Sequence, residues 1–294
     1  MKQELKIKDL YREIVSELKS KEISTPELDA RVIICYALKM TDADFFKTDN
    51  DLISNYQADK IIKLVRERVK NIPVAYILGQ KEFYGLNFYV NKNVLIPRPE
   101  SEWLVEEAVK YIKTQKRKIA ILDLGTGSGN IIISIYKSLM IGNWQFGVKF
   151  HASDISSKAL FIAKKNAKKY KLDKKIKLFH SDLFSNWRLQ KKFDLIVANL
   201  PYVPKNNEPL TVYRSPISFE PQNAIFASDN GAEIIKKFLV QAKNYLNNNG
   251  LILIELDPRN AADLKEFTQS NFPNTKIQLE KDLAGFERYL IIRI

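Results

Sequence analysis

The chain reads Ile121-Leu122-Asp123-Leu124-Gly125-Thr126-Gly127-Ser128-Gly129-Asn130-Ile131-Ile132 in its middle third. The apolar beginning predicts a buried strand, and the glycines that follow predict a tight turn that leads into a helix. Gly125, Gly127 and Gly129 remove side chains where the chain bends, so a ligand can lie against the backbone amides that open the helix. The stretch therefore predicts a strand, a ligand-binding loop and a helix of an α/β domain.

The spacing of the glycines separates two classes of ligand. A dinucleotide fingerprint places its third glycine five residues after the first, whereas Gly129 follows Gly125 by four. The strand also carries Asp123, whose carboxylate can interact with the ammonium group of S-adenosylmethionine (SAM), a charge that nicotinamide cofactors lack. Both features favour SAM over NAD. The expected contacts are Asp123, Gly125, Thr126, Gly127, Ser128 and Gly129. The alternative is a purely structural turn between a strand and a helix.

Two further acids follow predicted strands. Asp154 ends the strand Lys149–Asp154, where a carboxylate can accept hydrogen bonds from ribose hydroxyls. The alternative is that Asp154 caps the helix that begins near residues 156–157. Asp182 follows the strand Ile176–His180, and we expect it near the adenine of the cofactor.

Strands and helices alternate from about residue 98 onward. The other strands expected here are Ile119–Leu124, Phe193–Ala198 and Leu251–Leu256, and the helices are Glu102–Thr114, Lys158–Tyr170 and Ala232–Leu246. Residues 276–280 and 288–294 predict two closing strands. The pattern predicts an α/β, Rossmann-like fold, a mostly parallel sheet covered by helices with an antiparallel last strand.

Residues 4–70 have a helical pattern instead. Apolar residues recur at helical spacing in Leu5, Ile7, Leu10, Ile14 and Leu18. Pro26–Leu38 and residues 57–70 predict further helices. After them, Glu82–Val90 predicts a hairpin that turns at Gly85 or at residues 91–93.

These changes of pattern divide the chain into three parts. We expect a helical domain over residues 1–78, a β-hairpin linker over residues 79–97 and an α/β domain over residues 98–294. A chain of 294 residues is long enough for two domains that each bury a core.

The strand Phe193–Ala198 leads into Asn199-Leu200-Pro201-Tyr202, at the sheet edge where open α/β folds bind ligands. A planar amide or aromatic amine nitrogen is a poor nucleophile, so a site must polarise its N–H bonds and align it with a methyl donor. The side-chain oxygen of Asn199 and the carbonyl of Leu200 can each accept one N–H bond. Pro201 stiffens the turn, and Tyr202 can pack on the flat face. Taken alone, the segment also fits a proline-containing turn without a chemical role.

Several motifs together resemble the release-factor glutamine methyltransferase family (HemK/PrmC-like). They are Leu95-Ile96-Pro97-Arg98-Pro99-Glu100-Ser101-Glu102, Leu122–Gly129, Phe193–Pro204, Phe219-Glu220-Pro221, Asp229-Asn230-Gly231 and Lys281-Asp282-Leu283-Ala284-Gly285. The resemblance runs from the helical start to the last strand, and the Pro-Arg-Pro-Glu segment followed by this order of motifs is specific.

The resemblance implies a function for both domains. It implies transfer of a methyl group from SAM to the side-chain nitrogen (N5) of the glutamine in the Gly-Gly-Gln loop of peptide chain release factors. The helical domain would help to bind the release factor. SAM contacts carry over to Gly125–Gly129, Asp154 and Asn199. The catalytic and substrate-binding segment carries over to Asn199, Leu200, Pro201 and Tyr202.

Two residues depart from the family pattern. Leu200 stands where the family usually has proline, so the carbonyl acceptor remains but the turn loses rigidity. Leu183, a candidate cofactor contact, occupies a position often held by an aromatic residue. Trp187 is too far along the chain to replace it, and we expect a core or surface aromatic there. Arg98 and Glu220 are further candidate substrate contacts, although Glu220 could instead order its own loop.

Composition excludes several kinds of site. The single cysteine, Cys35, lies in an apolar run and predicts a buried thiol without a disulfide. The two histidines, His151 and His180, give no metal-ligand spacing, so we expect no metal. The beginning of the chain lacks the apolar core of a signal peptide, and no stretch approaches the roughly 20 apolar residues that span a bilayer. We expect a cytoplasmic protein without a membrane partner.

The partners follow from the charge and from the resemblance. A net charge of +13 attracts phosphate-rich partners, although lysine-rich surfaces also serve solubility. We expect a monomer that acts on release factors and requires no stable nucleic-acid complex. The nearest rival is an adenine-N6 or cytosine-N4 methyltransferase, because the same loop chemistry serves any planar amino group. A non-enzymatic basic α/β protein that binds ribosomal RNA or a protein partner is the remaining alternative.

Overall fold

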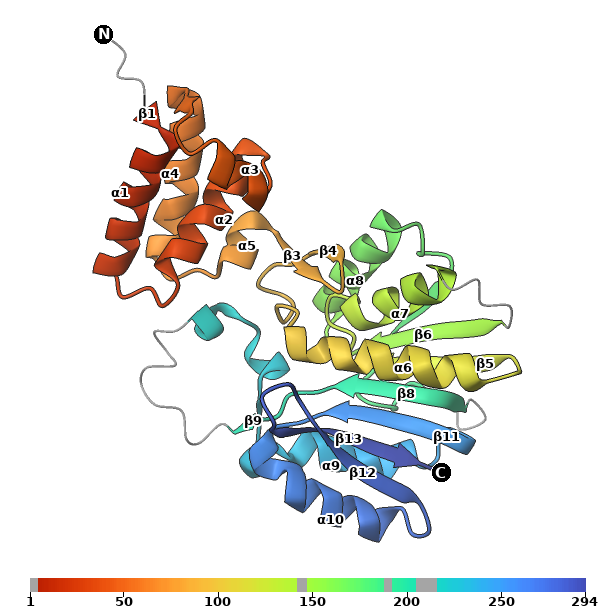
Figure 1. Ribbon diagram of the computed structural model, residues 1–294. Coiled ribbons are helices and arrows are strands. Elements are labelled where there is room, and N and C mark those ends of the chain that lie inside the picture. Colours follow the sequence, from red (N-terminus) through yellow and green to blue (C-terminus); the bar gives the residue numbers. More distant parts are fainter. Residues whose placement is uncertain (1–4, 142–146, 188–191, 205–215) are drawn as a thin grey trace. The chain divides into compact units, whose positions relative to one another are not determined.

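The chain divides into two compact units (Figure 1). The computed structural model describes residues 5–141, 147–187, 192–204 and 216–294. One unit holds the described residues up to Gln80 together with η3 (Pro216–Phe219), and the other holds the remaining described residues from Lys81 onward. Residues 1–4, at the start of the predicted helical domain, lie outside the described residues. The exact domain boundaries stay a prediction.

The first unit is helical, as its sequence pattern predicts. Its elements are β1 (Leu5–Lys6), α1 (Ile7–Ser20), α2 (Pro26–Leu38), α3 (Asp42–Lys47), β2 (Leu52–Ile53), α4 (Asn55–Val69) and α5 (Val74–Leu78). Thr41 and Ser54 form capping boxes that fix the starts of α3 and α4. Leu5 pairs with Ile53 in a short ladder, so the first helix begins at Ile7 and not at Leu5.

The single cysteine, Cys35, lies in the hydrophobic core of this unit. The residues of α1 that are buried in it are Ile7, Leu10, Ile14 and Leu18. Cys35 packs in the same core, and burial raises the pKa of its thiol to about 11. Cys35 is therefore the buried thiol without a disulfide that the sequence predicts.

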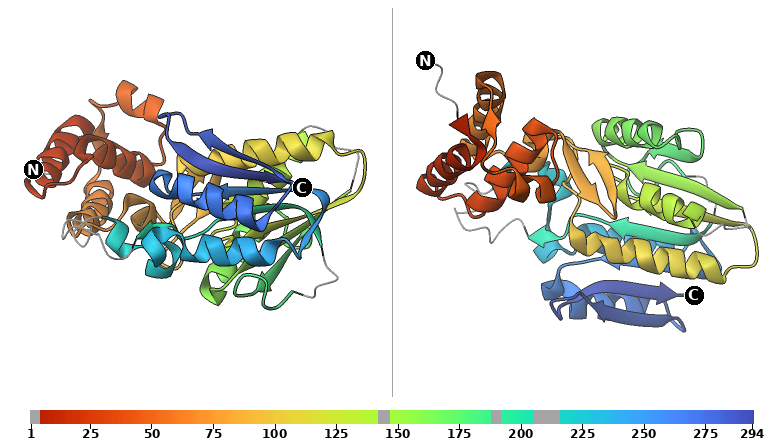
Figure 2. Two further views of the ribbon diagram at one scale, coloured as in Figure 1. Left: turned by 90° about the horizontal axis from the view of Figure 1, so that it is seen from below. Right: turned by 45° about the horizontal axis from the view of Figure 1, so that its top comes forward.

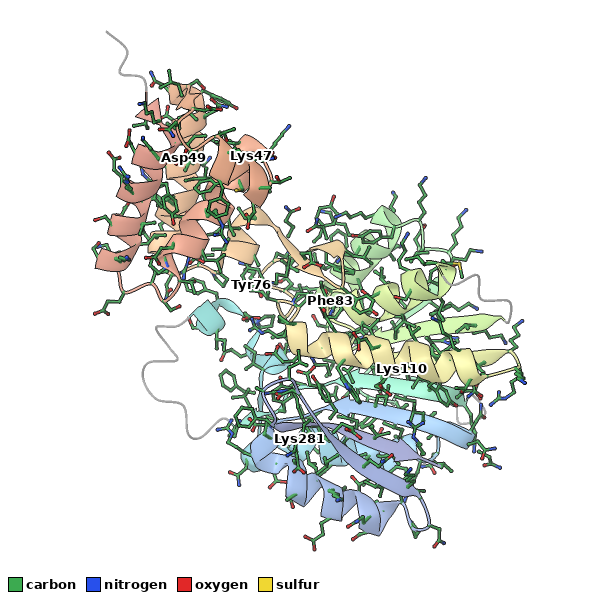
Figure 3. The ribbon with its side chains drawn as sticks, viewed as in Figure 1. Lys47, Asp49, Tyr76, Phe83, Lys110 and Lys281 are labelled. Carbon is green, nitrogen blue, oxygen red and sulfur yellow. The ribbon has the colours of Figure 1, made fainter. Side chains whose placement is uncertain are left out.

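The hairpin β3 (Gln80–Phe83) and β4 (Leu86–Tyr89) turns at Tyr84 and Gly85, the first of the two predicted positions. Both turn residues have positive φ angles, 52° and 71°, as a tight hairpin turn requires. From Lys81 onward the hairpin belongs to the second unit. Phe83, labelled in Figure 3, is 1% exposed in the core of that unit, and Phe88 is fully buried there.

The second unit contains a seven-stranded sheet of order β12-β13-β11-β8-β5-β6-β7. The strands are β5 (Ile119–Leu124), β6 (Val148–Asp154), β7 (Ile176–His180), β8 (Phe193–Asn199), β11 (Leu246–Glu255), β12 (Lys276–Lys281) and β13 (Glu287–Arg293). The strands from β11 to β7 pair in parallel, and β13 is antiparallel to both of its neighbours. The predicted α/β fold with an antiparallel last strand is confirmed.

Helices cover both faces of this sheet (Figure 2). They are α6 (Glu102–Thr114), α7 (Asn130–Ile141), α8 (Ser157–Lys169), α9 (Glu233–Ala242) and α10 (Ala261–Asn271). Side chains alternate between the faces: Leu195 and Val197 of β8 join the core under α6 and α7, whereas Ile196 and Ala198 join the core under α9 and α10. Each face buries its apolar side chains, which explains the continuous apolar runs of the strands.

The predicted helix over 232–246 is too long. α9 ends at Ala242, and β11 already begins at Leu246. Leu246 belongs instead to the next parallel strand, in which it pairs with Phe193 of β8. Long-range pairing thus overrides the local helical pattern at this point.

The remaining short elements are η1 (Pro99–Ser101), β9 (Val203–Pro204), η4 (Gln222–Ala224), β10 (Phe226–Ala227), η5 (Asp229–Gly231) and η6 (Pro258–Asn260).

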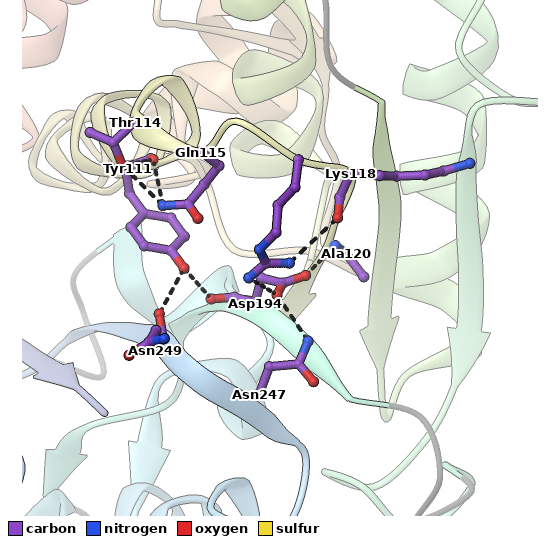
Figure 4. Close-up of polar contacts among 9 residues, drawn as sticks. Tyr111, Thr114, Gln115, Lys118, Ala120, Asp194, Asn247 and Asn249 are labelled. Atoms are coloured by element: carbon purple, nitrogen blue, oxygen red, sulfur yellow. Dashed lines mark hydrogen bonds and ion pairs between the residues drawn. The ribbon is translucent and has the colours of Figure 1, made fainter.

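Asp194 anchors the amino end of the central strand β8 (Figure 4). Its carboxylate is 2% exposed and accepts hydrogen bonds from Arg117 (2.7 Å), from the Ala120 backbone N–H (2.7 Å) and from Asn247 (2.9 Å). The Tyr111 hydroxyl donates to the Asp194 carbonyl at 3.0 Å. These contacts tie β8 to β5, α6 and β11 at the end opposite to the predicted site.

Candidate active site

A cavity of about 520 Å³ lies at the carboxyl ends of β5, β6 and β8. The chain leaves β5 toward β6 and later returns on its other side as β8, and a sheet with this order binds ligands at such a switch point. The predicted site residues that line the cavity are Arg98, Gly125, Thr126, Gly127, Ser128, Asp154, Asp182, Leu183, Asn199, Leu200 and Pro201. The predicted residues Asp123, Gly129, Tyr202 and Glu220 are not among its described lining residues.

The glycine loop is shaped by close contacts to its own surroundings. The backbone N–H groups of Gly125 and Thr126 both donate to the Ser153 carbonyl at 2.9 Å. Gly125 has a φ of 77°, and a Cβ there would lie 3.0 Å from a methyl carbon of Leu200. Around Gly127, at a φ of 54°, no atom lies within 4 Å of such a Cβ. The loop is therefore closed toward Leu200 and open where a ligand would approach Gly127.

Asp123 lies beneath this loop. It is 1% exposed, and the Thr126 hydroxyl donates to its carboxylate at 2.6 Å. Burial raises the pKa of Asp123 to about 7, against the lowering effect of that hydrogen bond. Its contact with an ammonium group stays a prediction, whereas its support of Thr126 is a feature of the structure.

Asp154 connects the glycine loop to the start of α8. One carboxylate oxygen accepts from the Gly127 N–H at 2.9 Å, and the other accepts from the Ser156 N–H at 2.8 Å. The hydroxyl of Ser156, and not Asp154, caps α8 by accepting from the Ala159 N–H. Burial raises the pKa of Asp154. Each oxygen keeps a second lone pair, so hydrogen bonds from ribose hydroxyls remain possible.

Asp182 and Leu183 lie together on the segment after β7. Asp182 is exposed at the cavity, and Leu183 has a φ of 46°, which is unusual for a branched side chain. The Ser181 hydroxyl donates to the Leu183 carbonyl at 2.9 Å and holds this turn. Trp187 is 7% exposed and packs 4.4 Å from Phe179, centroid to centroid, so it is a core aromatic as expected.

Asn199 is oriented by two buried side chains. Its amide nitrogen donates to the Ser101 hydroxyl at 2.8 Å and to a Glu255 carboxylate oxygen at 3.0 Å. The Ser101 hydroxyl donates to that same carboxylate oxygen at 2.6 Å. Because only the NH₂ side of the amide can donate to a carboxylate, these contacts fix the position of the Asn199 side-chain oxygen. Asn199 itself lines the cavity, where its side-chain oxygen can act as an acceptor.

Glu255 also holds Tyr202. The Tyr202 hydroxyl donates to the second Glu255 oxygen at 2.9 Å. Burial raises the pKa values of both groups, and the neighbouring Glu255 carboxylate raises that of Tyr202 further. The hydroxyl of Tyr202 therefore stays protonated as a donor. Its ring is partly buried, and its packing against a substrate stays a prediction.

Gly231 allows the backbone of Tyr202 to approach. A Cβ on Gly231 would lie 1.9 Å from the Tyr202 carbonyl oxygen, and Gly231 has a φ of 93°. The carbonyl of the adjacent Asn230 accepts from the Asn260 side chain at 2.7 Å. The segment 229–231 therefore supports the loop that follows β8.

Arg98 and Glu220 form an ion pair beside the cavity, in which Glu220 is buried and Arg98 is partly exposed. Glu220 is 4% exposed; one of its oxygens accepts from Arg98 at 2.5 Å and the other from the Ile96 N–H at 2.9 Å. Both carboxylate oxygens thus hold the segment 96–98. This geometry favours loop ordering for Glu220, whereas Arg98 reaches the cavity itself.

Sequence reasoning missed Ser101 and Glu255 as site residues. The signal for Glu255 was present, because an acid at the end of the apolar run Leu251–Glu255 has the same pattern that singled out Asp123 and Asp154. Ser101 gave no chemical signal of its own. Its role depends on the fold, which brings it to a residue 154 positions away.

The described part of the chain holds no cluster of three or more histidine, cysteine, aspartate or glutamate side chains arranged to bind a metal. Within the same residues, no helix is both long and apolar enough to cross a bilayer.

Comparisons with known proteins agree with this geometry. The PrmC N-terminal domain model matches residues 9–79, and a methyltransferase domain model matches residues 115–291. The protein named release factor glutamine methyltransferase of Rhodopirellula baltica is 36% identical over 277 residues, which cover 92% of this chain and 90% of that protein. The protein of the same name from Leptospira interrogans is 35% identical over 277 residues, with 94% and 93% coverage.

A solved structure shows the same fold at low sequence identity. The T. thermophilus 16S rRNA N2 G1207 methyltransferase, solved in complex with AdoMet and guanosine, has a TM-score of 0.50 and is 16% identical. The match covers 73% of this chain and 49% of that chain. The two extensive sequence matches go further than the fold and confirm the resemblance seen in the motifs. The chain belongs to the release factor glutamine methyltransferase family.

Proposed function

We propose that this enzyme transfers a methyl group from SAM to the side-chain nitrogen of the glutamine in the Gly-Gly-Gln loop of peptide chain release factors. The observation that carries the proposal is the fixed amide of Asn199, a residue that lines the same cavity as the glycine loop. The names of the relatives supply the glutamine of release factors as the substrate.

The residues of the cavity fit SAM. The open backbone at Gly127 leaves room for the cofactor, and the second lone pairs of Asp154 suit the two ribose hydroxyls. Asp182 and Leu183 would lie along the adenine. When bound, SAM would supply a methyl group on a positively charged sulfur; as the nitrogen takes the methyl group, the C–S bond breaks and the neutral thioether S-adenosylhomocysteine leaves.

The transfer loop then prepares the nucleophile. The Asn199 side-chain oxygen accepts one N–H bond of the glutamine amide and the Leu200 carbonyl accepts the other, so the nitrogen is polarised and aimed at the methyl group. Pro201 restricts the turn between them. The extra proton of the methylated nitrogen passes to water, which is why the site needs no strong base. The protonated Tyr202 supports the loop through Glu255 instead of acting as a base.

The substrate also suggests where the enzyme works. Release factors act in translation, so we place the enzyme in the cytoplasm, as a monomer that meets its partner transiently. The helical unit, whose sequence matches the PrmC N-terminal domain, would bind the release factor.

Mass spectrometry tests the proposed substrate. The chain is incubated with isotopically labelled SAM and either a class I release factor or duplex DNA. We expect the label on the glutamine of Gly-Gly-Gln and none on a release factor in which alanine replaces that glutamine. Label on adenine or cytosine of the DNA, with an unmodified release factor, would replace this proposal by the nucleic-acid alternative.

A further inference from the structure

The positive charge of the chain is concentrated in one segment. Residues 158–177 contain a single acid, Asp173, and nine lysines: Lys158, Lys164, Lys165, Lys168, Lys169, Lys171, Lys174, Lys175 and Lys177. These 20 residues carry a net charge of +8, whereas the whole chain carries +13. A general enrichment in lysine would spread the charge along the chain, so this concentration needs a local explanation.

This segment is a connected surface of the second unit, formed by α8, the turn after it and the start of β7, and we call it the lysine surface. All nine lysines are exposed. Within the described residues, none of them forms an ion pair, whereas Lys236 and Lys237 of α9 both do. Unpaired like charges at this density repel one another, and a bound polyanion would relieve that repulsion.

The helix α8 turns a distinct face to solvent. Its apolar face is already used, because Ile162, Ala163 and Ala167 are buried in the unit. On the other side Phe161 is 69% exposed. The lysines at positions −3, +3, +4 and +7 from Phe161 are Lys158, Lys164, Lys165 and Lys168. In Figure 3, long side chains that end in nitrogen project outward from this helix.

The lysine surface continues onto the hairpin. The ammonium groups of Lys165 and Lys169 lie 3.9 and 4.9 Å from the centroid of the Tyr89 ring. A cation over an aromatic face is held in place without losing its charge. Two of the lysines are therefore positioned, and the exposed Phe161 ring lies on the same helix as both.

We propose that the lysine surface binds the phosphate backbone of a single-stranded nucleic acid, with one unpaired base stacked on Phe161. Lysines supply sequence-independent phosphate contacts, and an exposed aromatic ring among them gives a base a platform. A membrane is disfavoured because the apolar face of α8 is buried and only one aromatic ring remains to insert. An acidic protein is disfavoured because protein interfaces are depleted of lysine. This site goes beyond methyl transfer and does not depend on the identity of the methylated substrate.

Fluorescence anisotropy with a labelled 12-nucleotide uridine RNA tests the surface charge. The test variant combines Lys164→Glu, Lys168→Glu and Lys174→Glu. The matched control, Lys243→Glu, Lys276→Glu and Lys281→Glu, makes the same charge change at exposed positions elsewhere in the second unit. We expect the wild-type affinity to fall steeply with salt and the test variant to flatten the log–log slope by about 2, three contacts at roughly 0.7 each. The control triple variant should keep most of the wild-type dependence of affinity on salt.

Phe161→Ala tests the stacked base. We expect an affinity loss of about tenfold with an unchanged salt slope, because the ring contributes stacking and no charge. A single-stranded DNA of the same length is measured in parallel, to determine whether the surface prefers RNA or DNA, which share the phosphate backbone. Any one of four results would overturn the proposal. These are an equal loss of salt slope in the control triple variant, no binding of the RNA at low salt, binding of polyglutamate as tight as that of the RNA, and wild-type RNA affinity in Phe161→Ala. Cofactor binding by every variant, measured by calorimetry with SAM, verifies that the fold is intact.

Discussion

The glycine loop, residues 125–129, and the transfer loop, residues 199–202, reach one cavity from neighbouring parallel strands, yet they are held in different ways. The glycine loop has partners within itself, since the Gly129 N–H donates to the Thr126 carbonyl and the Thr126 hydroxyl to Asp123, and further partners on the neighbouring strand β6, Ser153 and Asp154. The transfer loop depends on partners far along the chain, Ser101 and Glu255. The cofactor side is thus held from within the loop and by one adjacent strand, whereas the substrate side is held by residues 53 to 98 positions away along the chain.

Because the two loops are held in different ways, substitutions in them should affect different steps: SAM binding or methyl transfer. Changes in the transfer loop and its distant supports should reduce the rate of methyl transfer and leave SAM binding nearly intact. Changes at the glycine loop and Asp154 should weaken SAM binding and leave the rate at saturation nearly intact. The two loops approach each other at Gly125, where an added Cβ would lie 3.0 Å from the Leu200 side chain and 3.5 Å from the Asn199 carbonyl oxygen.

The largest effect is expected from Asn199→Ala. Removing the fixed acceptor should lower kcat by about a thousandfold, as the loss of one preorganised polar group in a transition-state site does. The KM for SAM should change by no more than a few fold. Initial rates with labelled SAM and a release factor measure both constants.

Asn244→Ala is the matched control for that variant, because Asn244 is exposed in the turn after α9. It should behave as wild type. Wild-type turnover by Asn199→Ala would remove Asn199 from the proposed mechanism and with it the distinction between the two loops.

Glu255→Gln should have the next largest effect, because it keeps the size of the side chain and changes its hydrogen bonding. A glutamine cannot accept from Ser101, Asn199 and Tyr202 as the carboxylate does, so the Asn199 amide loses its fixed orientation. A small misplacement of this kind costs about a hundredfold in kcat. SAM affinity, measured by calorimetry, should be unchanged. An equal loss in Glu266→Gln, at an exposed position on α10, would contradict a specific role for Glu255.

The same comparison explains what the sequence could predict. The glycine loop and the strand that carries Asp123 were recognisable because the signal is contiguous. The sheet was recognisable because buried parallel strands are continuous apolar runs. The orientation of Asn199 was not, because it depends on Ser101 and Glu255, which only the fold brings together. For the same reason the end of α9 was misplaced, since the pairing of Leu246 with Phe193 is non-local.

A smaller effect, confined to cofactor binding, is expected from Asp154→Asn. The asparagine NH₂ group would oppose the backbone N–H of Gly127 or of Ser156, and one acceptor for the ribose would be lost. SAM affinity should fall by about 10-fold, the value of one hydrogen bond to a charged group, and kcat at saturating SAM should stay close to wild type. Calorimetry and saturation kinetics separate these constants. Asp182→Asn, at an exposed position that we propose lies beside the adenine, should lose less affinity; an equal loss would argue against Asp154 as the ribose contact.

The smallest effect is a change in the pH dependence of stability in Asp123→Asn. The pKa of Asp123 in the folded chain, about 7, lies above its ordinary value of 3.8. Between these two pH values the folded state binds the proton more tightly than the unfolded state does, so the free energy of unfolding of the wild type should fall as the pH rises. Asparagine cannot titrate but can still accept from Thr126, so the variant should lose less stability over this window.

Urea unfolding from pH 4.5 to 7.5 measures both curves, with Asp59→Asn, on the exposed side of α4, as the control. Parallel curves for the wild type and Asp123→Asn would mean that Asp123 is already ionised beneath the loop, available to the ammonium group of SAM at every pH tested.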